Sequence, residues 1–196
     1  MSFINRDTNT VIVSGLPVGL VNTSDTKTGT VTYNWNVDIG TIDSRQYTVG
    51  VIVDGYYTRD SSVDDTVVTV SKPLSTGFIT GGGYLNLTSS AGLKAGDAGT
   101  KNNFGFNVKF NKSGKTLQGT INTIIRRTES DGMHVYQVKG NVMTSLAFVK
   151  GTSNKATFNG KASIQDITNP YAPVSVDGNA TLQVTMTVSF RQACLT

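Results

Sequence analysis

PLSTGFITGGGYLNL, residues 73–87, separates two groups of short segments in which apolar and polar residues alternate. Its proline and its three consecutive glycines, Gly81, Gly82 and Gly83, interrupt that alternation. Glycine has no Cβ, so such a run marks a sharp bend or a place where another backbone lies close. We therefore predict a joint between two small β units, with residues 75–80 as the hinge and the glycines opening the first strand of the second unit. Because the glycines lack G-x-G-x-x-G spacing and open no helix, we expect them to serve packing rather than phosphate binding.

Alternation predicts strands on both sides of this joint. The clearest segment before it is residues 29–37, GTVTYNWNV, where every second side chain is apolar. The other predicted strands are the short apolar segment 11–13 together with 46–53 and 66–71 before the joint, and 84–88, 104–110, 117–128, 133–139, 142–149, 156–164 and 176–190 after it. No helix is predicted. Many short strands separated by Gly/Asn turns are typical of an all-β protein built from sandwiches or barrels, here divided into residues 1–73 and 74–196.

The composition excludes several classes of protein. Charged residues make up only 15% of the 196 residues, and Glu129 is the only glutamate. The net charge of +4 is dispersed, whereas nucleic-acid binders concentrate basic and aromatic residues on one face. No segment approaches the roughly 20 apolar residues of a membrane helix, so neither nucleic acid nor membrane insertion is expected. The single cysteine, Cys194, allows no internal disulfide, and no signal peptide follows Met1.

A family resemblance covers about residues 77–187. Its motifs are the triple glycine opening a strand, NFGFNVKF at 103–110, a G-x-L-Q-G-like step at 114–119, and the later HVYQVKG, ATFNGKASIQDI and VDGNATLQVTMT segments. These motifs resemble the post-COAP-type β-domain of bacterial secreted and surface proteins. The resemblance implies a β-sandwich or barrel and a secreted or cell-surface location, with the export signal outside this chain.

Residues 1–73 resemble the last strands of an Ig-like sandwich, with Trp35 as the buried aromatic residue that such sandwiches use. Only four good strands are predicted there, against seven in a complete Ig domain, so this unit is expected to be truncated. The C-terminal segment 188–196, VSFRQACLT, also departs from the family pattern, and the second unit is expected to lack its last strands. Open sheet edges attract other chains, so we predict a homo-oligomer.

Four aspartates form the densest acidic group: Asp54, Asp60, Asp64 and Asp65. Carboxylates are the ligands that Ca²⁺ prefers, so a Ca²⁺ site is one interpretation, and no other cofactor is expected. The alternative is that Asp and Ser stabilise turns by bonding to the local backbone. The spacing matches no EF-hand loop.

Glu129, Asp131 and His134 are the one acid/base-like group. Paired carboxylates about 5–9.5 Å apart are what a glycosidase requires. The alternative is that residues 130–132 form an exposed hairpin turn that leaves the carboxyl pKa values unchanged. Cys194 could pair with His134 as nucleophile and base, although nothing in the sequence orients it.

Tyr56 and Tyr57 follow the hairpin signal Asp54-Gly55 and could stack on sugars of a polysaccharide. The function that we expect is a non-catalytic structural, adhesion or scaffold segment. The alternatives are a carbohydrate-binding module, or a hydrolase of glycosides or esters, with or without a metal, whose site lies between the two units or at a subunit interface. The hydrolase candidates are Asp54, Asp64, Asp65, Glu129, Asp131 and His134.

Overall fold

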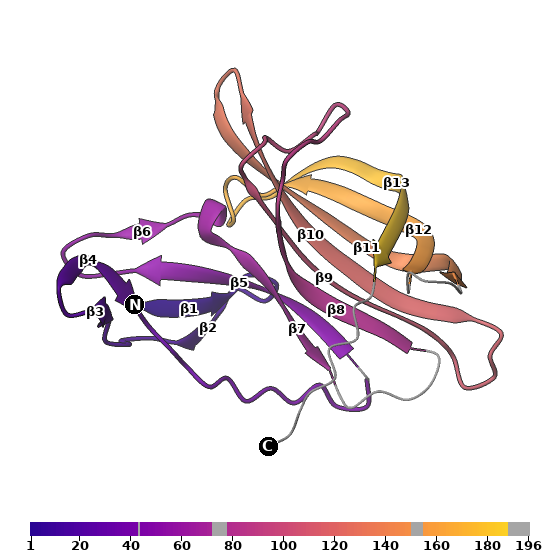
Figure 1. The fold of residues 1–196 in the computed structure, drawn as a ribbon, viewed down its shortest axis with the longest axis horizontal. Coiled ribbons are helices and arrows are strands. Elements are labelled where there is room, and N and C mark those ends of the chain that lie inside the picture. The colour runs from indigo at the N-terminus through magenta and orange to yellow at the C-terminus, as the bar shows by residue number, and fades with distance from the viewer. Residues whose placement is uncertain (43, 72–77, 150–154, 188–196) are drawn as a thin grey trace.

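The computed structural model describes residues 1–42, 44–71, 78–149 and 155–187. It is 63% strand and 2% helix, with antiparallel sheets packed as a sandwich (Figure 1). The prediction of an all-β fold is confirmed. The described elements are β1 Ser2–Asn5, β2 Thr10–Val13, β3 Gly19–Asn22, β4 Asp25–Thr30, β5 Ser44–Val53, β6 Arg59–Asp60, the 3₁₀ helix η1 Ser62–Asp64, β7 Thr66–Ser71, β8 Phe78–Asn86, β9 Lys101–Phe110, β10 Leu117–Glu129, β11 Gly132–Val149, β12 Lys155–Asp166 and β13 Val174–Thr187.

The first sheet is built around β5, which pairs with β1, β6 and β7. Alternation along β5 sends Tyr47 and Val49 into a small core with Trp35, and the rings of Trp35 and Tyr47 meet edge to face at 5.0 Å. The intervening Thr48 is only 1% exposed because it faces the second sheet. The middle of β5 is therefore buried on both faces.

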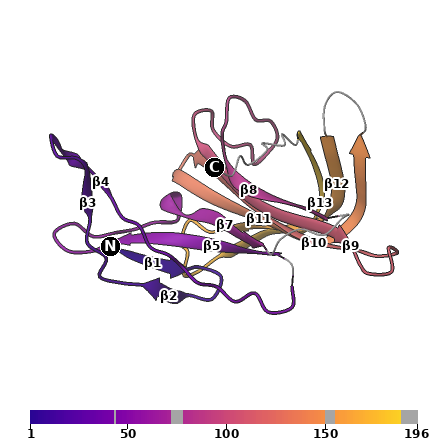
Figure 2. The ribbon, with the colours of Figure 1, turned by 60° about the horizontal axis from the view of Figure 1, so that its bottom comes forward.

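The strand predicted at residues 29–37 is only partly present. β4 ends at Thr30, and residues 31–39 are assigned no ladder within the described chain. Their alternation is still visible in burial, since Trp35 and Val37 pack onto the small core while their neighbours are exposed. Side-chain packing thus keeps this segment extended without backbone pairing. The β3–β4 hairpin before it projects away from the body of the molecule (Figure 2).

The second sheet is a meander of six antiparallel strands in sequence order, β8 to β13. It curls, so that apolar side chains of β8 and β13 pack on the same cluster as Phe106, Val108 and Phe158 (Figure 2). Register shifts in β11 between Gly140 and Val142, and again after Met143, provide the bend, since a bulge increases local twist. The sheet therefore builds its own core on its concave face.

The triple glycine lies inside β8 rather than at its beginning, which corrects the prediction. β8 begins at Phe78, so the last three residues of the expected hinge 75–80 are strand; residues 72–77, and with them the boundary at 73/74, lie outside the described residues. Gly82 pairs with Gly105 of β9. A Cβ on Gly82 would stand 2.7 Å from the hydroxyl of Thr69, and one on Gly105 would stand 2.5 Å from the same atom. The two glycines therefore let β7 lie directly on β8 and β9.

Elsewhere the contact between the sheets combines an apolar cluster with polar bonds. In the cluster, Val67 of β7 packs with Ile124 of β10, Val135 of β11 and Ile167. Thr48 Oγ1 accepts hydrogen bonds from Asn122 Nδ2 at 2.8 Å and from Gln137 Nε2 at 2.9 Å. Arg126, 6% exposed, donates to the carbonyls of Val63 and Asp65 in the first unit at 2.8 and 2.7 Å. These bonds and the glycine contact fix how the two sheets meet.

The remaining predictions concern one turn, the C-terminal segment and membrane spans. Residues 60–65, where Asp and Ser are expected to stabilise a turn as the alternative to a Ca²⁺ site, contain η1, whose first turn is capped by the Ser61 hydroxyl accepting from Val63 N. The segment 188–196 and Cys194 lie outside the described residues. Within the described chain no helix has the length and hydropathy of a membrane span.

Candidate functional sites

The predicted acid/base group lies at the end of the β10–β11 hairpin. The structure brings Glu129, Asp131 and His134 together, with one potential ligand atom of each within 4.8 Å of the others. Glu129 ends β10, and His134 follows the turn, opposite Arg127 in the register. Strand pairing alone therefore explains why residues close in sequence share this corner.

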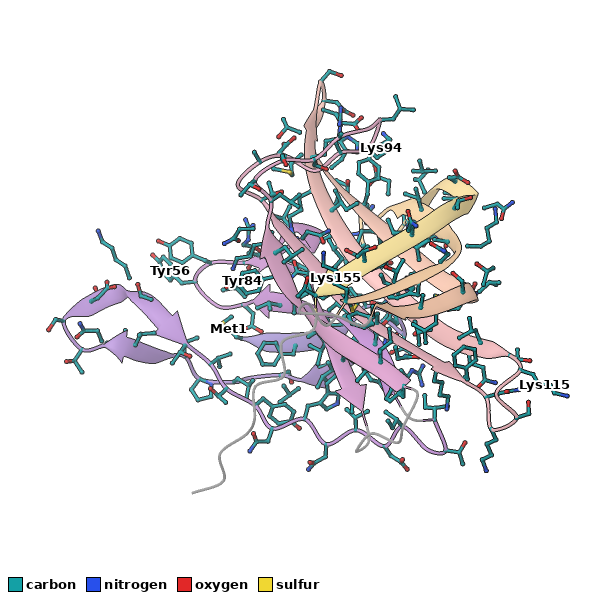
Figure 3. The ribbon with its side chains drawn as sticks, turned by 45° about the vertical axis from the view of Figure 1, so that its right-hand side comes forward. Met1, Tyr56, Tyr84, Lys94, Lys115 and Lys155 are labelled. Carbon is teal, nitrogen blue, oxygen red and sulfur yellow. The ribbon has the colours of Figure 1, made fainter. Side chains whose placement is uncertain are left out.

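A loop covers one side of this corner. Residues between β8 and β9 fold over the hairpin and bring Lys94 to it (Figure 3). Lys94 Nζ donates to Glu129 Oε1 at 2.9 Å and to the Tyr136 hydroxyl at 2.7 Å, and Tyr136 donates to Glu129 at 2.6 Å. The hydrogen bonds from Lys94 and then Tyr136 hold the pKa of Glu129 below its ordinary value. The expectation that the turn leaves this pKa unchanged is therefore wrong.

His134 is held between two carboxylates. Its Nδ1 lies 2.6 Å from Asp166 Oδ2 and its Nε2 lies 3.0 Å from Asp131 Oδ1. The hydrogen bond to Asp166, and then that to Asp131, raises the pKa of the imidazole because both favour the charged ring. The ring also stacks on Tyr136, at 6.0 Å between centroids.

This arrangement resembles an ion cluster more than an acid/base pair. A glycosidase acid needs a raised carboxyl pKa, and that of Glu129 is lowered. A metal ion could use Glu129, Asp131 and His134 Nε2, with Asp166 orienting the imidazole from the other nitrogen. It would have to compete with the ammonium group of Lys94, which is already bound to Glu129.

The four aspartates proposed for Ca²⁺ do not converge on one centre. Asp54 accepts from the Ser2 hydroxyl and pairs with the N-terminal amine at 3.3 Å, while Asp64 pairs with Arg59. Asp60 and Asp65 share the guanidinium of Arg6. A Ca²⁺ ion would have to displace these cations, so the Ca²⁺ site stays a prediction.

Arg6 is a residue that the sequence did not single out. Besides Asp60 and Asp65 it contacts the hydroxyl of Tyr171, which comes from the loop between β12 and β13 and also donates to Asp60. Asp65 is 1% exposed, and its Oδ2 has no partner within the described chain. Burial raises the pKa of Asp65 to about 6, outweighing the opposing effect of Arg6. The only signal for Arg6 in the sequence is a basic residue directly after the apolar segment of β1.

The predicted sugar-stacking residues are fully available to solvent. Tyr56 is 99% exposed and Tyr57 78%, and their rings meet edge to face at 5.8 Å. Both lie in the loop between β5 and β6, and Figure 3 shows Tyr56 pointing away from the body of the molecule. Their exposure agrees with, but does not test, a role in sugar binding.

Two clefts lie between the sheets. One, of about 540 Å³, is lined by Asp64, Asp65 and Arg126 together with groups of β8 and β9. The other, of about 770 Å³, lies between β5 and the face of β9 to β12 and contains none of the predicted residues. Of the six hydrolase candidates, only Asp64 and Asp65 line either of these clefts, so the structure does not gather the six into one site.

None of the protein-family models, curated proteins or solved structures compared with this chain matches it.

Proposed function

We propose that this chain is a non-catalytic scaffold or adhesion module of a bacterial extracellular or cell-surface protein, in which one sheet holds the other at a fixed orientation. The observation that carries the proposal is Arg126. This residue lies in β10 and is 6% exposed. Its guanidinium donates hydrogen bonds to the backbone carbonyls of Val63 and Asp65 in the first unit. A buried arginine that bonds to the backbone of another sheet fixes both the position and the angle of that sheet, since its donors have a planar fork geometry. The bacterial and extracellular part of the proposal rests on the resemblance of residues 77–187.

The candidate acids support a structural role. Each of the carboxylates considered for catalysis or metal binding bonds to a neighbouring basic group, and most of these bonds join separate segments. Glu129 binds Lys94, 35 residues earlier, and Asp65 binds Arg6, 59 residues earlier. Such pairs hold loops and strands in place.

Rigidity of the junction is the property to measure. Spin labels on Val11→Cys and Gln183→Cys, in a Cys194→Ser background, report the distance between the exposed sides of the two sheets. A scaffold predicts one narrow distance distribution in the otherwise unchanged protein, broadened by Arg126→Met. A broad distribution without that substitution would contradict the proposal.

A second experiment distinguishes the enzymatic alternative from the scaffold proposal. A panel of chromogenic glycosides and esters, with and without EDTA, should give no turnover. Turnover that Glu129→Gln or His134→Gln abolishes would replace the scaffold proposal with a hydrolase, and its loss in EDTA would make the hydrolase metal-dependent.

Carbohydrate binding is a second candidate function, favoured by the exposure of the adjacent rings of Tyr56 and Tyr57. Retention of the protein on insoluble polysaccharide should fall in the double variant Tyr56→Ala/Tyr57→Ala. The variant Tyr171→Ala, which removes an exposed tyrosine elsewhere, is the matched control. Unchanged retention in the double variant would remove these two residues from consideration.

We also propose that the chain self-associates through an open edge of the second sheet. Within the described chain β13 pairs only with β12, and it exposes Val174 and Val176. A long unpaired edge is a template for another strand. Light scattering at tens of micromolar should show a dimer or larger species that Val174→Lys/Val176→Lys dissociates; a monomer before substitution would exclude this association.

A further inference from the structure

The corner formed by Glu129, Asp131 and His134 presents three potential metal ligands on one hairpin. One ligand atom of each lies within 4.8 Å of the others. Glu129, at the end of β10, is 26% exposed and His134, in β11, is 20% exposed, whereas Asp131, in the turn, is 71% exposed. Two of the side chains are therefore held by strands, and the third is free to move and complete a site.

The imidazole of His134 is oriented from outside this hairpin. Its Nδ1 lies 2.6 Å from Asp166 Oδ2 on β12. Asp166 is itself held in place, since its Oδ1 accepts hydrogen bonds from the backbone N–H and the hydroxyl of Thr168 at 2.8 and 2.5 Å. A carboxylate on the second ring nitrogen is typical of metal-binding histidines, because it fixes the tautomer and the plane of the ring. Nε2 is thereby left to face the corner.

Nε2 of His134 and Oδ1 of Asp131 need a positive charge between them. When Nδ1–H donates to Asp166, the neutral ring presents a lone pair at Nε2, and the carboxylate oxygen 3.0 Å away is also an acceptor. Two acceptors at this distance repel each other unless a proton or a metal ion lies between them. Their separation is close to the ~3.4 Å that two ligands of a tetrahedral ion span at bond lengths of about 2.1 Å.

Glu129 can supply a third ligand without breaking its present contacts. Lys94, Tyr136 and Arg127 all meet it at Oε1, at 2.9, 2.6 and 3.4 Å. Its other oxygen, Oε2, accepts no hydrogen bond within the described chain. That oxygen is therefore available to a metal ion while Oε1 keeps its donors.

The two cations beside Glu129 oppose a metal ion, and one of them can leave. Arg127 is part of β10, but Lys94 comes from the loop between β8 and β9, and its side chain is 34% exposed. The loop is anchored independently by Asp97, whose Oδ2 accepts from Thr128 N at 2.7 Å. The ammonium group can therefore turn into water while the loop stays in place.

We propose that this corner binds a divalent transition-metal ion of the zinc type, with His134 Nε2, an oxygen of Asp131 and Glu129 Oε2 as its ligands. Binding exchanges the proton between Nε2 and Asp131 for the metal ion and releases that proton to solvent. One imidazole with two carboxylates favours Zn²⁺ over Ca²⁺, which takes oxygen ligands. The site goes beyond the scaffold role and requires no reaction at the metal.

Calorimetry with Zn²⁺ or Ca²⁺ alone tests the proposal, in a Cys194→Ser background so that the thiol contributes nothing. We expect Zn²⁺ to bind with a Kd tighter than about 100 μM, and Ca²⁺ to bind at least about a hundredfold more weakly. Absence of Zn²⁺ binding at millimolar concentration, or equal affinity for Ca²⁺, would overturn the proposal.

Substitutions assign the ion to this corner. Asp131→Asn and His134→Gln should each weaken Zn²⁺ binding by about tenfold or more, whereas Asp38→Asn, at an exposed aspartate of the first unit, should not. Lys94→Met should tighten binding by about threefold or more because it removes an opposing charge, a gain that misfolding cannot produce. Lys115→Met, at the far tip of the β9–β10 hairpin (Figure 3), is its matched control. Binding that survives His134→Gln, or that Lys94→Met does not tighten, would overturn the assignment.

The ring of His134 gives a direct readout. It is the only histidine of the chain, so its two nitrogens give a single pair of ¹⁵N resonances. Zn²⁺ should shift the Nε2 resonance and leave the Nδ1 proton bonded to Asp166; coordination through Nδ1 would contradict the proposal. The junction distances that test the scaffold proposal involve none of these residues, so a failure to bind zinc leaves that proposal intact.

Discussion

The two faces of the six-stranded sheet are built differently. The concave face is apolar, with Val108 and Phe158 fully buried against aliphatic and aromatic neighbours from the same sheet. The face under the first sheet is mixed. Ile124 and Val135 pack with Val67 of β7 in a small apolar cluster, and the other contacts come from glycine, amide and guanidinium groups, among them Gly105, Asn122 and Arg126. The concave face forms the core of the six-stranded sheet itself, and the other face packs against the first sheet.

The difference separates the interactions that stabilise the six-stranded sheet from those that fix the orientation of the first sheet on it. Apolar burial gives about 25 cal/mol per Å² and has no preferred direction, so it stabilises the curled sheet without fixing a partner. A hydrogen bond contributes only about 1 kcal/mol net but depends strongly on geometry. The mixed face, with its smaller apolar cluster, should therefore add less to stability than the concave face, while its polar groups specify where β5 and β7 lie.

The most damaging change should be on the concave face. Phe158→Ala removes a fully buried ring and should lower the free energy of unfolding by about 3–5 kcal/mol, measured by chemical denaturation. Phe110→Ala, at a residue 41% exposed, is the control and should cost much less. Equal losses would mean that the concave face is not the main core.

Arg126→Met should have the next largest effect. The arginine bonds to the carbonyls of Val63, Lys101 and Asp65 and to the amide oxygen of Asn103, and the acceptors of the buried residues Asp65 and Asn103 would lose this donor without gaining water. We expect a loss of about 3 kcal/mol in chemical denaturation. Arg127→Met, on the opposite face and 32% exposed, should cost about 1 kcal/mol at most. The reverse order would show that the junction does not depend on Arg126.

Stability should fall as pH rises from about 4 to 6. The pKa of Asp65 is about 6 in the folded state, above its ordinary value of 3.8. The folded protein therefore binds this proton more tightly, and the stabilisation is lost as the proton leaves. A difference of about two pKa units corresponds to roughly 3 kcal/mol, which Asp65→Asn should abolish in denaturation curves between pH 4.5 and 7.

His134 extends the same trend to higher pH. Its pKa is raised, so its contribution is complete below about pH 6.5 and is lost as pH rises through the folded pKa. His134→Gln should flatten only this upper part of the profile and leave the change at lower pH intact. A stability that rises from pH 4.5 to 7 would contradict both assignments.

The smallest effect concerns the close contact of β7 with β9. A Cβ at Gly105 would stand 2.8 Å from Val67 and 3.0 Å from Gln46, so Gly105→Ala should cost about 1–3 kcal/mol. Gly178→Ala, where a Cβ meets nothing within 4 Å, should stay within about 0.5 kcal/mol. Thermal or chemical unfolding compares the two, and equal effects would show that β7 can move away without cost.

Much of the fold follows from local pattern. Alternation predicts β5, β7, β9 and β10 because each strand must place every second side chain in a core. It is wrong about residues 31–37, whose side chains alternate in burial but whose backbone joins no ladder within the described residues. Alternation reports which side chains are buried, whereas pairing depends on which strand edges are nearby, and that is a long-range property.

The candidate site also combines contacts that local sequence predicts with long-range contacts that it does not. Glu129, Asp131 and His134 are neighbours in the sequence, so a hairpin is enough to bring them together. Lys94 and Asp166, which set their charge states, come from 35 and 32 residues away. Nothing local in the sequence specifies those contacts, and the same is true of Arg6 with the aspartates proposed for Ca²⁺.

The polar face of β5 also has a consequence for synthesis on the ribosome. Thr48 meets Asn122 and Gln137, which follow it by 74 and 89 residues. At about 5–20 residues per second, the first sheet waits roughly 4 to 18 s for these partners to be made. A threonine face in contact with water during that interval is a weak target for aggregation, whereas an apolar one would invite premature association. The wait is therefore tolerated on this face of β5, because the surface that its late partners cover is a hydrated one.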